Sequence, residues 1–294
     1  MCSSDLFFYF AFGDSYTTTG FDINGVQPAP GNPFGNPAYD QTISSAPADP
    51  FAGGPNYVGF LATKYNSSYV LAYDFAVGGA TITNSLVSSS APFETQVGRY
   101  FEPKYTSPHV GDWNSDNAIF SVFFGINDVD GSLSNGASPA DPSTRVPALL
   151  DAYFMLCDNL YQQGARRFMF VGVPPLDRSP LIQTESQEIQ TEYRDYANDF
   201  NGQLAQRITQ WAGENAGVVA ATYDYHRWLS AVLDDPASLG FPDATCINSD
   251  GQSCIWANNY HVGSRLNDAL AQRMLPAMNS LGFDGSAPVG GYFY

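Results

Sequence analysis

Five short apolar runs recur along this chain, and segments with helical periodicity separate them. The runs cover residues 7–12, 70–76, 118–124, 168–173 and 218–223. Runs this short and this uniformly apolar are typical of strands buried on both faces of a parallel sheet. Their alternation with helices predicts an α/β fold, a three-layer α/β/α sandwich built on a central parallel sheet.

Two of the intervening segments carry clear helical signals. One covers about residues 146–163 and stops at Gly164, a residue type that commonly terminates helices. The other has apolar residues at spacings of three and four, which predict one buried stripe on a long helix: Ile189, Tyr193, Tyr196, Phe200, Leu204, Ile208 and Trp211. In doubly wound sheets, ligands bind at the carboxyl ends of the strands. Functional residues are therefore expected directly after the apolar runs.

Composition excludes several classes of partner. The 294 residues include 44% hydrophobic and 15% aromatic residues, enough for a sizeable core, and no repeat or linker divides them. The formal charge of −17 disfavours nucleic acid and anionic membranes, because phosphate binding requires clustered Lys and Arg. No apolar run approaches the ~20 residues that span a bilayer. Segments 21–55 and 131–143 are long for simple connections and are expected to line a cleft.

A serine follows the first apolar run, in the sequence Phe12-Gly13-Asp14-Ser15-Tyr16. A serine hydroxyl becomes a nucleophile when a base removes its proton, and the oxyanion formed on attack needs hydrogen-bond donors. The backbone N–H of Ser15 begins the turn or helix after the strand, where it is placed to donate. Gly-Asp-Ser alone is a weak signal, since a loop or N-cap serine would explain it equally. Asp14 is expected to fix the loop rather than to act as the base.

Two further blocks follow the second and third apolar runs. Gly79 offers a backbone N–H that a substrate can approach closely, although a turn would require glycine just as much. Asn127 offers a side-chain amide donor without adding charge, and an Asx-turn is its plain structural alternative. Asp128 is interpreted as a structural cap or acceptor.

His261 is the best candidate for the general base, because imidazole titrates near neutral pH. It is expected at the start of the final helix, from which it would fold back over the strand ends. The chain has two other histidines. His109 lies in a polar segment, and His226, which follows the last apolar run, is kept as the reserve base.

These four blocks, in this order, resemble the SGNH, or GDSL, hydrolase superfamily over nearly the whole chain. The resemblance implies a flavodoxin-like sandwich forming a single domain over residues 1–294. It also implies that Ser15 is the nucleophile and His261 the base. The oxyanion hole would then comprise the Ser15 N–H, Gly79 and Asn127. Neither the pattern nor the residues indicate a cofactor, and scattered histidines argue against a catalytic metal.

One departure from the family pattern concerns the residue that orients the histidine. The family has an aspartate three residues before the histidine, whereas this chain has Asn258. An amide oxygen still accepts a hydrogen bond from Nδ1–H and fixes the tautomer, but it cannot neutralise an imidazolium. Three arrangements remain open: Asn258 orients His261, another carboxylate such as Asp250 or Asp268 reaches the ring, or the serine and histidine work as a dyad. Val262 also replaces a proline common after this histidine.

Within the superfamily, the serine block and residues 32–37, 78–81 and 125–128 most resemble the fungal secreted acetylesterases of carbohydrate esterase family sixteen. This implies removal of acetyl groups from xylo-oligosaccharides or related hemicellulose sugars. Phe34, Tyr39 and Tyr57 are candidate platforms for sugar rings, with loop packing as the alternative. The rival functions are a lipase or short-chain carboxylesterase and a catalytically weak carbohydrate-binding protein, the latter motivated by Asn258.

Cysteine placement and the first residues bear on the compartment. Cys246 and Cys254 bracket a turn-rich segment and are expected to form a disulfide, although two reduced thiols are the alternative. Asn66 opens an N-glycosylation sequon. Residues 2–6 match the translation of a common sequencing-adaptor read, so residues 1–6 are interpreted as a non-native replacement of a leader. We expect a secreted, monomeric enzyme whose partner is a small-molecule or oligosaccharide ester.

Overall fold

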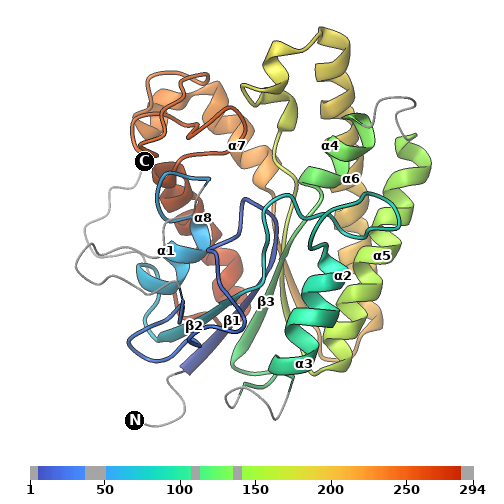
Figure 1. Ribbon diagram of the computed structural model, residues 1–294, viewed down its shortest axis with the longest axis vertical. Coiled ribbons are helices and arrows are strands. Elements are labelled where there is room, and N and C mark those ends of the chain that lie inside the picture. Colours follow the sequence, from blue (N-terminus) through green and yellow to red (C-terminus); the bar gives the residue numbers. More distant parts are fainter. Residues whose placement is uncertain (1–5, 37–50, 107–112, 135–140, 286–294) are drawn as a thin grey trace.

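The computed structural model describes residues 6–36, 51–106, 113–134 and 141–285. A five-stranded parallel sheet forms its centre (Figure 1), in the order β2-β1-β3-β4-β5. The strands are β1 (Leu6–Gly13), β2 (Tyr69–Asp74), β3 (Ala118–Phe123), β4 (Arg167–Val171) and β5 (Val219–Tyr223). Each coincides with one predicted apolar run, and every neighbouring pair is parallel. The predicted α/β/α sandwich is therefore confirmed.

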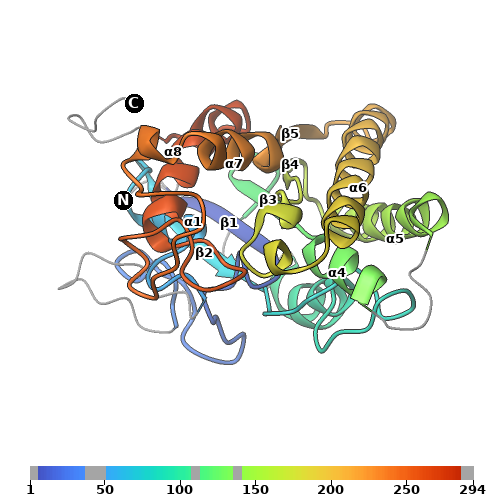
Figure 2. The same cartoon turned by 90° about the horizontal axis from the view of Figure 1, so that it is seen from above.

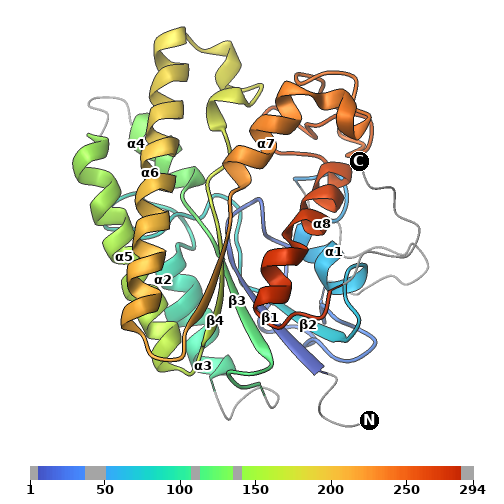
Figure 3. The same ribbon diagram turned by 180° about the vertical axis from the view of Figure 1, so that it is seen from behind.

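Helices cover both faces of the sheet (Figures 1 and 3). On one face lie α1 (Tyr57–Thr63) and α8 (Ser264–Ser280), which pack against each other. The other face is covered by α2 (Phe93–Thr95), α3 (Glu102–Tyr105), α5 (Pro142–Gln162) and α6 (Gln187–Glu214). A π-helical turn, Gln96–Phe101, joins α2 to α3. The short helices α4 (Ile126–Ser134) and α7 (Tyr225–Asp234) follow the carboxyl ends of β3 and β5.

Local sequence explains the two longest helices on this second face. The Asp141 carboxylate caps α5 by accepting from the Ser143 N–H, and Gly164 follows the helix with a left-handed φ of 106°. Ser186 caps α6 in the same way, through the Ile189 N–H. The predicted apolar stripe of α6 is buried from Tyr193 to Trp211, while Ile189 in the first turn is partly buried.

The core is dense in aromatic rings around β1. Phe10 is fully buried and stacks on Tyr73 and Phe120, with ring centroids 5.2 and 4.9 Å away. Phe101 and Trp113 meet the same ring edge-on at 5.5 Å. Burying a ring of this size stabilises the fold by roughly 1.5–3 kcal/mol. Aromatic packing therefore anchors β1, which ends at Gly13, two residues before Ser15.

Candidate active site

The Ser15 hydroxyl lies in a tight turn at the carboxyl end of β1. The Asp14 carbonyl accepts from the N–H groups of Thr17 and Thr18, at 3.1 and 3.0 Å, which closes the turn. The fully buried Asp14 carboxylate accepts from the Tyr16 N–H at 2.9 Å. Asp14 thus fixes the loop, as predicted. A turn rather than a helix follows the strand, so no helix dipole acts at the Ser15 N–H.

His261 meets this serine from the other end of the chain. Its Nε2 lies 2.8 Å from the Ser15 Oγ, across 246 positions of sequence. The imidazole lies in the loop before α8, which begins at Ser264, so the prediction that His261 starts the final helix is wrong. The reason is that Val262 forms a bridge with Trp256, which keeps the chain extended up to Gly263. Figure 2 shows this loop on the side of the sheet where α1 lies.

The Asn258 side chain lies against the other imidazole nitrogen. Its Oδ1 is 3.1 Å from His261 Nδ1 and also accepts from the N–H groups of Tyr260 and His261, at 2.9 and 2.8 Å. Its Nδ2 donates to the Phe51 carbonyl at 3.2 Å. An amide oxygen only accepts, so Nδ1 carries the imidazole proton and Nε2 is free to accept from the serine hydroxyl.

The carboxylates considered as alternatives are engaged elsewhere. Asp268 binds the Lys64 ammonium at 2.6 Å and accepts from the Tyr65 hydroxyl at 2.8 Å. Asp250 accepts from the N–H groups of Gln252 and Ser253 within its own turn. The geometry therefore brings Ser15, His261 and Asn258 together and leaves both carboxylates out.

The other two expected oxyanion donors, Gly79 and Asn127, lie beside the serine turn. Gly79 is exposed, with a left-handed φ of 76° and open space where a Cβ would project. The Asn127 amide, at the start of α4, donates to the Ala80 carbonyl at 2.9 Å and to the Asp14 carboxylate at 3.3 Å. Asn127 thus links the residue after Gly79 to the residue before Ser15. Donation to an oxyanion would require the longer of these two bonds to be exchanged.

Asp128 binds the backbone shortly after Gly79. It is completely buried, and its Oδ1 accepts from the Ile82 N–H at 3.0 Å, which agrees with the predicted structural role. Burial raises the pKa of Asp128 to about 7. The carboxyl group therefore changes charge near neutral pH inside the core.

The imidazole of His261 lies among aromatic rings. The Phe51 ring stacks on it with centroids 4.8 Å apart, and the Tyr16 ring lies at 5.3 Å. Burial lowers the pKa of His261 to about 4, so the ring is neutral and able to accept a proton over most of the pH range.

The other two histidines are not part of this arrangement. His226, the reserve base, lies on α7 and lines a separate cavity of about 340 Å³ together with residues of α6. Burial lowers its pKa as well, and the charges around it include Asp177 and Asp224. His109 lies outside the described residues.

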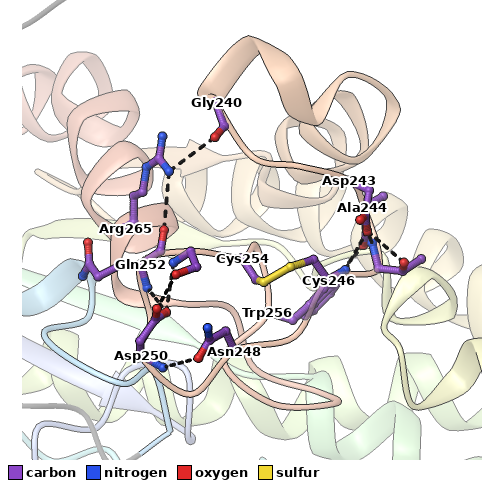
Figure 4. The surroundings of a disulfide bond; sticks show 12 residues. Gly240, Asp243, Ala244, Cys246, Asn248, Asp250, Gln252, Cys254, Trp256 and Arg265 are labelled. Atoms are coloured by element: carbon purple, nitrogen blue, oxygen red, sulfur yellow. Dashed lines mark hydrogen bonds between the residues drawn. A yellow bond between two sulfur atoms is a disulfide. The ribbon is translucent and has the colours of Figure 1, made fainter.

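A disulfide braces the segment that precedes His261 (Figure 4). Cys246 and Cys254 are bonded, as the sequence analysis expected. Trp256, two residues beyond Cys254, donates from its indole Nε1 to the Ala244 carbonyl at 2.8 Å. Asp243 and Asp250 close short turns by accepting from backbone N–H groups within the segment. The disulfide and these turns hold the entry to the histidine loop.

The structure contradicts the prediction that Phe34 and Tyr57 are platforms for sugar rings. Phe34 and Tyr57 are buried, each about 1% exposed, so neither offers a ring to a sugar. Tyr39 lies outside the described residues. Two residues beside the site gave no signal in the sequence. The side-chain amide of Gln96 binds both backbone groups of Gly13, and the Phe51 ring stacks on the imidazole. A lone phenylalanine in a segment rich in Gly and Pro carries no local signal of its role.

Within the described residues, no three His, Cys, Asp or Glu side chains gather as metal ligands would. The same residues include no helix that is long and apolar enough to cross a membrane.

Known proteins of one family resemble this chain in sequence and in fold. Residues 9–274 match the model of the GDSL-like lipase/acylhydrolase family. An acetylesterase of Thermothelomyces thermophilus is 36% identical over 94% of this chain and 89% of its own length. An acetylesterase of Hypocrea jecorina is 22% identical over 92% and 88%. A solved acetyl-xylooligosaccharide esterase from Geobacillus stearothermophilus superposes with a TM-score of 0.50 at 13% identity, covering 94% of both chains, which shows a shared fold.

Proposed function

Because this chain belongs to the GDSL-like lipase/acylhydrolase family, we propose that it is a serine acetylesterase acting on acetylated xylo-oligosaccharides or related hemicellulose sugars. It is a carboxylic ester hydrolase. The observation that carries the proposal is the contact of 2.8 Å between Ser15 Oγ and His261 Nε2, in a turn flanked by backbone and amide donors.

The reaction follows from the positions of these groups. His261 Nε2 takes the proton of Ser15 as its Oγ attacks the ester carbonyl, and the carbonyl oxygen becomes an oxyanion. The N–H groups of Ser15 and Gly79 and the Asn127 amide stabilise that charge. The imidazolium then protonates the leaving alcohol, which leaves acetyl on Ser15. A water molecule, deprotonated by His261, releases acetate and restores the hydroxyl.

Asn258 acts in this proposal as the orienting residue. It fixes the tautomer of His261 but carries no charge to offset the imidazolium. The imidazole is therefore held for proton transfer without an anionic partner. This arrangement also weakens the alternative of a carbohydrate-binding protein, since the serine and the histidine are already in contact.

The choice of an acetyl group is supported by the acetylesterases at 36% and 22% identity. The family description also includes lipases, so a short-chain carboxylesterase or lipase is the rival within the same fold. The preferred length of the acyl chain distinguishes an acetylesterase from a lipase, because both would use the same nucleophile.

The test measures acetate released from acetylated xylo-oligosaccharides, beside p-nitrophenyl esters of increasing acyl length, for wild type and Ser15→Ala. Acetyl-selective turnover that disappears in the variant is expected. Preference for longer chains would establish the lipase alternative. Folded wild-type protein without any turnover would contradict the esterase proposal altogether.

The enzyme is proposed to work outside the cell, as one domain over residues 1–294 and as a monomer. The disulfide between Cys246 and Cys254 supports an oxidising compartment. Size-exclusion chromatography with light scattering tests the monomer, and detection in the culture medium of the native host tests secretion.

A further inference from the structure

A short segment before α1, residues 51–56, lies between the serine turn and the histidine loop and contacts both. The Ala52 carbonyl accepts from the Ser264 N–H at 2.9 Å, and the Pro55 carbonyl accepts from the Ser264 hydroxyl at 2.7 Å. The Asn56 amide donates to the carbonyls of Thr17 and Thr18, at 2.6 and 3.0 Å. This segment therefore ties the start of α8 to the turn that carries Ser15.

Phe51 is the residue of this segment that contacts the catalytic histidine. Its ring stacks on the His261 imidazole at 4.8 Å, with 28° between the planes. The same ring packs against Gly78, since a Cβ at that position would come within 2.9 Å of it. The Phe51 ring thus stacks on the imidazole, while the imidazole Nε2 contacts Ser15.

The backbone of the same residue acts on the orienting side chain. The Phe51 carbonyl accepts from Asn258 Nδ2 at 3.2 Å, while three donors converge on Asn258 Oδ1. Each end of the amide thus has the partner that its chemistry requires. A flipped amide would direct N–H groups at donors and an oxygen at a carbonyl, so this contact helps to keep Oδ1 toward the imidazole.

We propose that Phe51 is a positioning residue of the catalytic site, holding the His261 ring with its side chain and the Asn258 amide with its backbone carbonyl. This inference rests on the proposed function of Ser15 and His261. It also accounts for an amide at position 258, because an aspartate there would place a carboxylate oxygen about 3.2 Å from the Phe51 carbonyl oxygen.

The Phe51 ring also shields the imidazole from water. Burial lowers the pKa of His261. The titratable groups around the ring are the hydroxyls of Tyr16 and Tyr260 and the buried Asp14 carboxylate, which contacts the Tyr16 N–H. Removal of the Phe51 ring therefore admits water and moves the pKa of His261 upward, toward its ordinary value.

The test compares Phe51→Ala, Phe51→Leu and Phe51→Tyr with wild type, using p-nitrophenyl acetate across a pH range. For Phe51→Ala, kcat is expected to fall about 10- to 100-fold with KM nearly unchanged, because a displaced base costs rate rather than binding. The acid limb of kcat/KM is expected to shift to higher pH by roughly one unit. Phe51→Tyr, which keeps the ring, is expected to retain both values.

Phe60→Ala is the matched control, since Phe60 is a partly buried phenylalanine of α1 that packs on the core. It is expected to lower Tm without moving the acid limb. If Phe51→Ala does not fold, Phe51→Leu provides the same comparison. Wild-type kcat and an unmoved acid limb in the folded variant would overturn the inference.

Asn258→Asp tests the role of the carbonyl. Activity at or below that of wild type is expected, because the carboxylate meets the Phe51 carbonyl. A gain of tenfold or more would overturn this part of the inference. Ser15→Ala separates the two proposals: if it is inactive while Phe51→Ala behaves as wild type, the esterase stands and the positioning role fails. If Ser15→Ala retains turnover, both fail.

Discussion

The turn that carries Ser15 is anchored by buried polar groups, whereas residues 242–253, which lead toward His261, are largely exposed and are held by a disulfide and short turns. On the serine side, Asp14 and Gln96 are fully buried, and the buried Asp74 accepts from the Thr19 N–H at 2.7 Å. On the histidine side, the acceptors Asp243 and Asp250 are exposed, and hydrogen bonds within their turns lower the pKa of each.

This difference indicates how the site is assembled. Buried acceptors are satisfied only in the native fold, so the serine turn forms together with the core. Exposed turns contribute little free energy by themselves, and a covalent link offsets this by restricting the unfolded chain. The position of the nucleophile therefore depends on the core, and that of the base depends on a cross-link and on the contacts of residues 51–56.

The largest expected effect concerns the base. His261→Ala should lower kcat/KM by about 10⁴-fold, because in the described part of the chain no other group is placed to take the Ser15 proton. Turnover of p-nitrophenyl acetate by the purified variant measures this loss. His226→Ala is the control and should retain activity; loss of turnover in that variant alone would assign the base to His226 instead.

Removal of the side-chain oxyanion donor should have the next largest effect. Asn127→Ala is expected to lower kcat by about 10²- to 10³-fold with little change in KM, since the charge develops only on attack. Part of this loss is structural, because Asn127 also binds Ala80 and Asp14. Tm of the variant separates the two contributions, and an unchanged kcat would exclude Asn127 from the oxyanion hole.

The buried carboxyl group on the serine side gives a stability effect with a definite sign. The pKa of Asp128 is about 7 in the folded chain against 3.8 when exposed, so the folded state binds the proton more tightly. Protonated Asp128 therefore contributes fully to the free energy of unfolding below about pH 4. As pH rises toward 7, this contribution is lost, and the free energy of unfolding falls by roughly 3–4 kcal/mol. Between pH 5 and pH 8, denaturant unfolding should show the larger part of this loss, roughly 2–3 kcal/mol, in wild type and a smaller change in Asp128→Asn. Equal pH dependence in both proteins would show that Asp128 does not cause this change in stability.

Loss of the disulfide should have the smallest effect, confined to the histidine side. Replacing Cys246 and Cys254 by serine is expected to cost about 2–3 kcal/mol, given the short loop that they close. Activity should fall at temperatures where circular dichroism still reports an intact sheet. Cys157→Ala, which removes a buried free thiol, is the matched control. Simultaneous loss of activity and of the sheet would show that the histidine segment is no less stable than the serine turn.

The sequence by itself determined the parallel sheet, the two long covering helices, and the candidates Ser15 and His261. These follow from signals that are local, namely apolar periodicity, capping residues and short blocks at strand ends. Only the tertiary structure decided that Asn258 rather than Asp250 or Asp268 meets the imidazole. It also placed His261 in a loop before α8 and Phe51 against its ring. Such contacts join segments up to 246 positions apart, and their geometry depends on how the whole core packs, which no local pattern encodes.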